Sequence, residues 1–322
     1  MPTEFELIAQ YFKVPARRRD VLLGIGDDAA VLEVPPGSSL VATTDTLVAG
    51  VHFPSQTSPE DLGHKALAVS LSDLAAAGAE PAWVTLALTL PEVNEAWLAA
   101  FSTGLGRLLE SSGAELVGGD TTRGPLSVTL QALGLVPEGR ELRRSTAVVG
   151  DSVFVTGCLG DAALGLAALQ GRVALSEPAL AYCVGRLNRP SPRIEAGIAL
   201  RGVAHALIDI SDGLLADLGH ILTASGVGAD LRLEEVPLSV PVKTWLEAGG
   251  DWDTVLAGGD DYELLFTAPE SVRPALEAAF RRIDCPLSHI GRIEAEPGLR
   301  LWRPDGAEHR AGRTGYDHFA EA

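Results

Sequence analysis

Two carboxylates and a hydroxyl lie close together near residue 210, where Asp209 and Asp212 flank Ser211. An apolar run precedes them and a helical pattern follows Gly213, so we expect these side chains on a strand-to-helix turn. Carboxylate and hydroxyl oxygens are hard ligands of the kind that suits Mg²⁺. Taken alone, the turn is explained equally well by a solvated acid at Asp209 and a helix N-cap at Asp212.

A second acidic turn ends the apolar run at residues 21–28, where Asp27 and Asp28 follow two glycines. The glycines allow a tight turn or a close approach to a ligand. The segment is not a dinucleotide fingerprint, because Gly24-Ile25-Gly26 lacks the third glycine and the helix that should follow it. An ordinary turn remains an equal alternative here.

The segment Leu40–Phe53 has the composition of a β-strand and carries Thr43, Thr44 and Asp45 in its middle. Threonine suits strands, whereas aspartate is depleted in them unless it has a partner. His52 near the end of the segment is ambiguous, since a lone histidine is more often structural than catalytic.

The segment Pro59–Gly78 is predicted to be a helix, with Pro59 in its first turn. Its body is apolar nearly all round, which indicates a buried helix. Asp73 shares a face with Val69 and Ala77, so its carboxylate is expected to be buried. A buried carboxylate is costly unless it is paired or bound to a metal, which favours a functional Asp73.

Two Gly-Gly-Asp sequences add further acids. Gly119 and Asp120 follow a predicted strand, and the second sequence, which ends at Asp260, precedes one. Arg143 and Arg144 lie between them. Adjacent arginines are usually surface residues, but beside a metal-rich site they would bind phosphate oxygens.

The remaining pattern predicts two α+β domains of comparable size, residues 1–148 and 149–322, divided near Val149-Gly150-Asp151. The expected helices and strands lie at residues 4–12, 83–90, 95–112, 114–120, 127–136, 152–156, 162–170, 180–187, from 193 onward, 206–209 and 214–222. The aromatic end Gly315–Phe319 is expected to pack back onto the body.

The totals narrow the class of protein. The chain has 322 residues, a net charge of −18 and 46% hydrophobic residues. The acidic surplus disfavours a nucleic-acid binder. No apolar run is long enough to span a membrane, and the acidic start Met1–Glu6 lacks a signal-peptide pattern, so a cytoplasmic location is expected. Cys158, Cys183 and Cys285 have no zinc or CxxC spacing and are expected to be free thiols.

Several common catalytic motifs are absent: the chain has no P-loop, no protein-kinase set, no Gly-x-Ser-x-Gly and no His-Glu-x-x-His. If the acidic turns converge, their mutual repulsion requires cations among them. Several Mg²⁺ ions held by carboxylates could bind a nucleotide triphosphate where a P-loop would use backbone N–H groups. Phosphoryl transfer needs mainly such positioning and charge neutralisation.

Together these motifs resemble the thiamine-monophosphate kinase family, collinearly from near residue 5 to Phe319. The segments that carry the resemblance are Gly24–Ala29, Thr43–Phe53, Leu71–Ala79, Gly118–Thr122, Asp209–Gly213 and Gly258–Glu263. Each is weak alone and the set is highly specific. The wider superfamily includes aminoimidazole ribonucleotide synthetase, selenophosphate synthetase and a hydrogenase maturation factor, all of which use ATP.

The resemblance implies an α/β (α+β) fold of two domains, with the N-terminal sheet pairing across a homodimer. It implies Mg²⁺-dependent phosphorylation of thiamine monophosphate by ATP, with Asp45, Asp120 and Asp212 in catalysis. The implied metal ligands are Asp28, Thr43, Thr44, Asp45, Asp73, Asp120, Asp209 and Asp212. The implied ATP contacts are Gly119, Asp120, Arg144 and Ser211, and the implied thiamine monophosphate contacts are His52, Glu263 and Tyr316. Asp260 departs from the glutamate that is frequent at that position.

The acceptor would be a phosphate monoester, whose second pKa is roughly 6, so its oxygen is already anionic and needs no general base. We therefore expect direct in-line attack with several Mg²⁺ ions and no phospho-enzyme. Alternatives are a superfamily enzyme acting on a ribonucleotide or selenide, and a non-catalytic nucleotide-binding regulator. Selenide chemistry calls for an N-terminal cysteine, whereas the first here is Cys158. A merely acidic structural protein does not explain Asp73.

Overall fold

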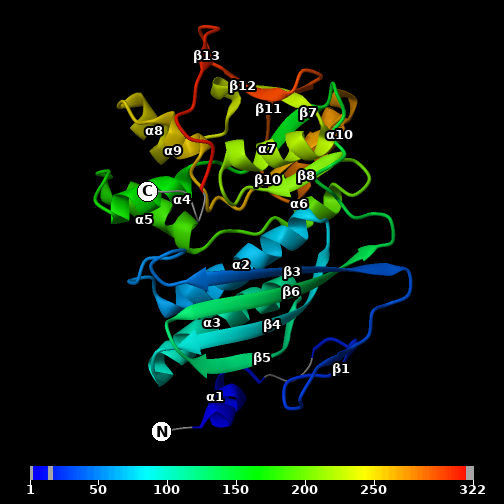
Figure 1. The fold of residues 1–322 in the computed structure, drawn as a ribbon, viewed down its shortest axis with the longest axis vertical. Coiled ribbons are helices and arrows are strands. Elements are labelled where there is room, and N and C mark those ends of the chain that lie inside the picture. The colour runs from blue at the N-terminus through cyan, green and yellow to red at the C-terminus, as the bar shows by residue number, and fades with distance from the viewer. Residues whose placement is uncertain (1–2, 14–16, 317–322) are drawn as a thin grey trace. The chain divides into compact units, whose positions relative to one another are not determined.

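The computed structural model describes residues 3–13 and 17–316. Tertiary contacts divide the chain into two compact units. The N-terminal unit consists of Met1–Leu74 and Ala79–Glu141, and the C-terminal unit of Ala75–Gly78 and Leu142–Ala322. Both units combine helices with a sheet, as the sequence predicts (Figure 1).

Over its described residues, the N-terminal unit contains a short two-stranded hairpin, a four-stranded sheet and three helices. In chain order its elements are α1 (Glu4–Tyr11), β1 (Val21–Leu23), β2 (Val31–Leu32), β3 (Ser38–Val48), α2 (Pro59–Ala76), β4 (Glu80–Leu90), α3 (Glu95–Ser112), β5 (Glu115–Arg123) and β6 (Ser127–Pro137).

The two long helices of this unit form where the sequence places them. The Asn94 side chain caps α3 by accepting the Trp97 N–H at 3.0 Å, and Gly113 ends it with a φ of 72°. Helices α2 and α3 approach closely, because a Cβ on Gly104 would lie 1.9 Å from the Glu60 carbonyl oxygen. Glycine at this crossing lets the two backbones touch.

The four-stranded sheet has the order β3-β6-β4-β5, with β4 and β5 parallel and the other pairs antiparallel. One face is apolar and buried, as shown by Val128, Leu130 and Ala132 of β6. We call the other face the open face. It is defined by five exposed residues on three strands: Ala42, Thr44, Thr46, Ala87 and Gln131.

The C-terminal unit contains a seven-stranded sheet with helices on both sides. Its elements are β7 (Ser152–Thr156), α4 (Asp161–Leu169), α5 (Glu177–Asn188), α6 (Ile194–Ala199), β8 (Ala206–Asp209), α7 (Leu214–Ser225), β9 (Gly228–Arg232), η1 (Leu233–Glu235), α8 (Val240–Glu247), α9 (Trp252–Leu256), β10 (Leu264–Ala268), η2 (Glu270–Val272), α10 (Arg273–Arg282), β11 (Leu287–Glu294), β12 (Gly298–Trp302) and β13 (Glu308–His309).

The strand order of this sheet is β13-β12-β9-β11-β7-β10-β8. Because side chains alternate along a strand, the central strands contribute residues to two hydrophobic cores, one on each face of the sheet. Val153 and Val155 of β7 pack with residues of α4, α7, α8 and α9. Phe154 packs on the other side, where its ring stacks on Phe266 at 5.2 Å. Helices α6 and α10 cover that second core.

Two predicted strands are shorter than expected. The run at 21–28 is a strand only at Val21–Leu23 and continues as an irregular segment. The segment Leu40–Phe53 is regular only to Val48, because a turn with Gly50 at a φ of 78° follows. All three cysteines are free, as predicted.

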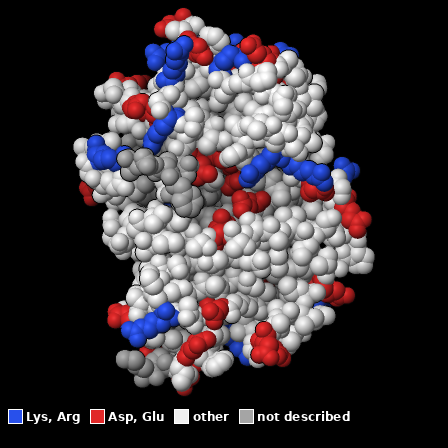
Figure 2. All heavy atoms as spheres, viewed as in Figure 1, with Lys and Arg blue, Asp and Glu red and all other residues white. Residues whose placement is uncertain are grey.

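Charge is unevenly distributed over the surface. Figure 2 shows acidic and basic side chains next to one another in several places on the drawn face, and wide uncharged areas elsewhere. Within residues 3–13 and 17–316, no helix is both long and apolar enough to cross a membrane.

Candidate functional site

Two of the predicted ligands, Asp45 on β3 and Asp73 on α2, lie on the helix-covered side of the N-terminal sheet. The Ser70 hydroxyl donates to Asp45 Oδ2 at 2.7 Å, and the Thr43 hydroxyl donates to Asp73. Burial, together with the charge of Asp73, raises the pKa of Asp45 to about 6. Two carboxylates held in this way repel each other when both are ionised, so the arrangement favours a bound cation.

The sheet register separates Asp120 from this pair. Paired residues share a face, and Asp45 pairs with buried Leu130, whereas Asp120 pairs with exposed Ala87. Asp120 and Thr44 therefore lie on the open face. Since β3 and β5 are three strand spacings apart, Asp45 and Asp120 of one chain are separated by roughly 14 Å and cannot contact the same ion.

Gly119 allows the edge strand to pack closely on β4. Its φ is 149°, and a Cβ there would lie 1.8 Å from the Leu86 carbonyl oxygen. Any side chain at this position would disrupt the strand, so the glycine is structurally required beside Asp120.

The other predicted residues of this unit lie in irregular segments. Asp28 is exposed in a bend, and its N–H donates to Asp27 Oδ1 at 2.9 Å. The ring of His52 is half-buried, and its Nδ1 accepts the Val48 N–H at 3.0 Å. Because Nδ1 is an acceptor, the neutral imidazole carries its proton on Nε2.

In the C-terminal unit, the turn Ser211–Gly213 joins β8 to α7, as the sequence predicts. Gly213 has a φ of 118°, and a Cβ there would lie 2.9 Å from the Ala257 backbone, so only glycine fits. Ser211 and Asp212 are half-buried, and Asp209 at the end of β8 is buried. The turn thus presents Ser211 and Asp212 near the surface.

Sequence reasoning gave no role to Asp217 in the first turns of α7. Its buried carboxylate accepts hydrogen bonds from the backbone of Ser211–Gly213. Burial raises the pKa of Asp217 to about 7 against these hydrogen bonds, which lower it. The available signal was an acid four residues after the glycine that begins the helix.

The second Gly-Gly-Asp loop lies against this turn. The Asp260 N–H donates to the Ser211 carbonyl at 2.9 Å, and the Tyr262 hydroxyl donates to Asp260 Oδ1 at 3.1 Å. Asp260 is half-buried and has a φ of 71°, a conformation that aspartate tolerates better than most residues. Asp260 is therefore a second acid beside Ser211 and Asp212 that the predicted site did not include.

Glu263, three residues further on, is completely buried. Its carboxylate accepts hydrogen bonds from Arg186 at 2.8 Å, from Arg193 at 2.6 Å and from the Thr156 hydroxyl at 2.7 Å. With no exposed surface, Glu263 cannot touch a ligand in this conformation, contrary to the contact expected from the resemblance. Its position fits an anchor for the loop that carries Asp260.

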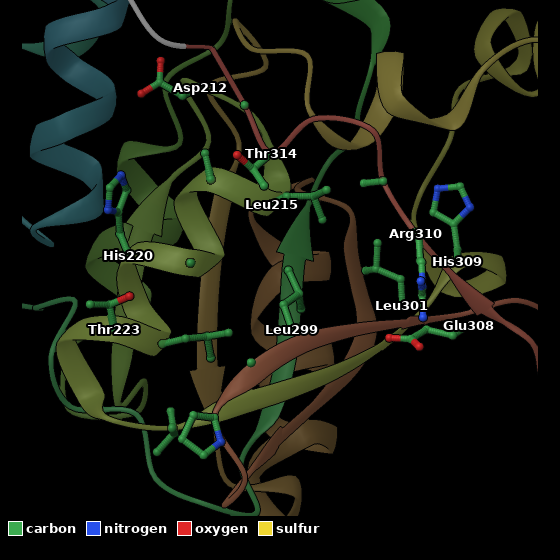
Figure 3. A pocket seen from close by; sticks show the side chains of 18 of the residues that line it. Asp212, Leu215, His220, Thr223, Leu299, Leu301, Glu308, His309, Arg310 and Thr314 are labelled. Atoms are coloured by element: carbon green, nitrogen blue, oxygen red, sulfur yellow. The ribbon is translucent and has the colours of Figure 1, made fainter. Parts of the chain in front are cut away.

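Tyr316 docks on the same turn, with its N–H donating to the Asp212 carbonyl at 3.1 Å. Its side chain is 51% exposed. Asp212 and Tyr316 both line a groove of about 1100 Å³ that runs along α7. Figure 3 shows Asp212 at one end of this groove, with His220 and Thr223 further along α7. The rest of the predicted aromatic end, residues 317–319, lies outside the described residues.

The predicted arginine pair lies in the segment beside β8. The Arg143 carbonyl accepts the Leu207 N–H at 2.9 Å, and the Arg144 carbonyl accepts the Ser225 hydroxyl at 3.2 Å. These contacts fix the backbone, and both residues are exposed.

Among the described residues, no three His, Cys, Asp or Glu side chains are grouped around one potential metal position. Mg²⁺ does not require such a group, because it is commonly bound by one or two carboxylates together with waters and substrate phosphates. The pair Asp45 and Asp73, with Thr43, provides hard oxygen ligands of that kind. These residues therefore fit Mg²⁺.

Family models match most of the chain. Residues 26–136 match the AIR synthase related protein N-terminal domain, and residues 148–303 match the corresponding C-terminal domain.

Curated relatives match almost the full length. The chain is 52% identical over 320 residues to a thiamine-monophosphate kinase of Salmonella typhimurium, covering 98% of each chain. It is 43% identical over 324 residues to that of Haemophilus influenzae, covering 99% of this chain and 98% of the relative.

Solved structures of thiamine-monophosphate kinases also match this chain. The thiamine-monophosphate kinase of Stenotrophomonas maltophilia K279a matches with a TM-score of 0.85 at 47% identity, covering 91% of this chain and 93% of that one. AaThiL complexed with AMPPCP and TMP matches with a TM-score of 0.78 at 34% identity, covering 89% of each. A hydrogenase maturation protein HypE shares the fold, with a TM-score of 0.78 at 20% identity, covering 95% of this chain and 92% of that one.

Proposed function

The chain belongs to the thiamine-monophosphate kinase family, and on that premise we propose that it transfers the γ-phosphoryl group of ATP to thiamine monophosphate, forming thiamine diphosphate. The observation that carries the proposal is the full-length similarity to enzymes of that name, one of which was solved with AMPPCP and TMP. The acid-bearing turns supply a chemical reason for it.

The metal ligands of the proposed enzyme are Asp45 and Asp73 with Thr43, the turn acids Asp209 and Asp212, and the remaining predicted ligands Asp28, Thr44 and Asp120. When bound, Mg²⁺ ions neutralise phosphate charge during transfer. Support comes from the raised pKa of Asp45, which reflects burial and a neighbouring carboxylate. Such a site is stabilised by a cation.

Transfer is proposed to be direct and in line. The acceptor phosphate of thiamine monophosphate is ionised at neutral pH, so the chain needs no general base. The contribution of its residues is to position the two phosphates. Gly119, Asp120, Arg144 and Ser211 are proposed to contact ATP, with Arg144 donating to phosphate oxygens.

For thiamine monophosphate we propose His52, Tyr316 and Asp260. Asp260 takes the place that the resemblance gave to Glu263, because it is the half-buried acid of that loop and lies beside Ser211. The exposed ring of Tyr316 is suited to stack on an aromatic ring of the acceptor. Asp260 provides a negative charge for the cationic thiazolium.

The proposed active form is a homodimer in which the open face of the N-terminal sheet pairs with a second copy. Support comes from the exposure of that face and from the apolar side chains exposed near it, such as Leu40 at 49%. Since Asp45 and Asp120 of one chain lie on opposite faces of the sheet, they would bind different ions. Sedimentation velocity tests the dimer by its mass.

The deciding experiment measures ADP and thiamine diphosphate by chromatography after incubation with ATP and Mg²⁺, with and without thiamine monophosphate. Thiamine diphosphate formed only with the acceptor supports the proposal. ADP without thiamine diphosphate would direct the search to another acceptor, such as a ribonucleotide. No ADP with any acceptor would contradict the proposal and favour a non-catalytic nucleotide-binding regulator.

A further inference from the structure

The carboxylate of Asp217 collects three successive backbone N–H groups of the turn before α7. Its Oδ2 accepts from Ser211 at 3.0 Å, from Asp212 at 3.1 Å and from Gly213 at 3.2 Å. Asp217 is only 2% exposed. One buried oxygen thus accepts hydrogen bonds from all three backbone N–H groups of Ser211–Gly213.

Consecutive N–H groups at the start of a helix normally form a binding site for phosphate, because the N–H dipoles and the helix dipole both favour an anion. In this turn a buried carboxyl oxygen of the protein itself already occupies that place. A nucleotide phosphate cannot use the same N–H groups while Asp217 is bound to them.

The carbonyl groups of the turn are engaged as well. The Ser211 carbonyl accepts the Asp260 N–H at 2.9 Å, the Asp212 carbonyl accepts the Tyr316 N–H at 3.1 Å and the Gly213 carbonyl accepts the Asp217 N–H at 3.0 Å. Every backbone polar group from Ser211 to Gly213 therefore has a partner within the protein. A ligand at this turn would therefore be contacted by side chains and not by the backbone of Ser211–Gly213.

We propose that Asp217 is a positioning residue that makes this turn suited to a cation rather than to a phosphate. It holds the three N–H groups inward, and the Asp212 carboxylate would coordinate an Mg²⁺ ion bound to ATP. The proposal rests on the proposed function insofar as Asp212 is taken as a ligand of Mg²⁺ bound to ATP. It goes further by assigning the preference for a cation to a buried residue outside the ligand set.

The test compares Asp217→Ala, Asp217→Asn and the unchanged protein. Asp217→Ala removes the accepting carboxyl oxygen and releases three N–H groups. We expect inorganic phosphate, titrated without Mg²⁺ in a calorimeter, to bind Asp217→Ala and not the unchanged protein. This readout does not require kinase activity, so it stands or fails independently of the proposed reaction.

Kinetics provide the second readout. In Asp217→Ala the Mg²⁺ concentration for half-maximal activity should rise by at least about tenfold, as is typical when a group that supports a metal ligand is removed. Sodium formate, a small carboxylate, should reverse the rise and displace phosphate, whereas sodium chloride should not. A lower melting temperature with unchanged Mg²⁺ dependence and no phosphate binding would overturn the proposal in favour of a helix cap alone.

Asp217→Asn keeps the test decisive if the alanine variant does not fold. Its amide oxygen can accept the same N–H groups, so we expect half-maximal Mg²⁺ within about twofold of the unchanged protein and no phosphate binding. If Asp217→Asn folds but its Mg²⁺ concentration for half-maximal activity rises as much as is expected for Asp217→Ala, the assignment is overturned. Asp251→Ala is the control, since Asp251 caps α9 of the same unit through the Asp253 N–H at 3.1 Å.

Discussion

Arg193 holds Glu263 through two parallel contacts, Nε to Oε2 and Nη2 to Oε1, both at 2.6 Å. The carboxylate is completely buried, and Arg186 adds a third charged contact at 2.8 Å. This arrangement raises the pKa of Arg193 through its hydrogen bond and charge interaction with Glu263, although burial lowers it. An acid that appears from the sequence to be available for a substrate is thus part of a buried ionic cluster.

Glu263→Gln should therefore destabilise the protein. Removing the charge leaves two arginines without their buried partner, which we expect to lower the free energy of unfolding by about 3 kcal/mol. Urea denaturation measures the change. The matched control is Glu277→Gln, since Glu277 pairs with Arg273 at 3.1 Å on the surface and should change stability by less than about 0.5 kcal/mol. Normal stability with a raised KM for thiamine monophosphate would instead support direct contact by Glu263.

Asp260→Asn should show the opposite behaviour. Asparagine accepts the positive φ of this position, so the fold should be retained. Loss of the negative charge beside the acceptor should raise the KM for thiamine monophosphate about tenfold while leaving the KM for ATP unchanged. Steady-state kinetics measure both constants. Asp284→Asn, at another aspartate with a positive φ, is the control, and an equal effect there would argue against the assignment.

Asp45→Asn should stabilise the metal-free protein and impair the reaction. The folded protein raises the pKa of Asp45 from 3.8 to about 6, so the folded state binds a proton more tightly than the unfolded state between these values. The stability that Asp45 contributes is therefore lost as the pH rises toward 6 and above. In EDTA at pH 7 the variant should melt roughly 2–4 °C higher than the unchanged protein, and the difference should vanish near pH 4.

With Mg²⁺ the ranking should reverse, because the added ion stabilises only the protein that retains its ligand. The kcat of Asp45→Asn should fall at least about a hundredfold. Differential scanning calorimetry and the coupled ADP assay provide the two measurements. Asp284→Asn, at an exposed aspartate outside the proposed site, is the stability control. Unaltered kcat in Asp45→Asn would remove Asp45 from the metal site.

Mixing two inactive variants tests whether the site is shared between copies. If Asp120 serves the partner's site, a hybrid of Asp45→Asn and Asp120→Asn has one intact site and one doubly altered site. Random exchange should then restore about a quarter of full activity, because half of the dimers are hybrids and each has one working site. If both residues serve the same chain's site, every site in the hybrid lacks one of them and activity stays absent. Each variant incubated alone is the control.

Local sequence patterns were sufficient to predict the main helices and the turn before α7. The helix expected over residues 59–78 is α2, Pro59–Ala76, and the expected helix at 95–112 matches α3, because periodicity and caps act over a few residues. The turn at Ser211–Gly213 could be predicted for the same reason: its strand, glycine and helix are contiguous. The family could be identified because its motifs are contiguous segments.

Tertiary structure decided which acids lie together. Alternation along β3 places Thr43 and Asp45 on one face and Thr44 on the other, but the face of Asp120 depends on the pairing of β5 with β4 and of β4 with β6. That register is a long-range property.

The environments of Glu263 and Asp217 likewise depend on long-range contacts that the local sequence does not reveal. The partners of Glu263 on the arginine side lie 70 and 77 residues away, so its burial could not be predicted from the neighbouring acids. Asp217 appeared as one polar residue of a helix, and only folding of the preceding turn brings three N–H groups onto its carboxylate. Residue types and local spacing thus determined the chemistry that the chain can perform. Packing decided which carboxylates can reach a ligand, because burial and hydrogen bonding depend on contacts distant in the sequence.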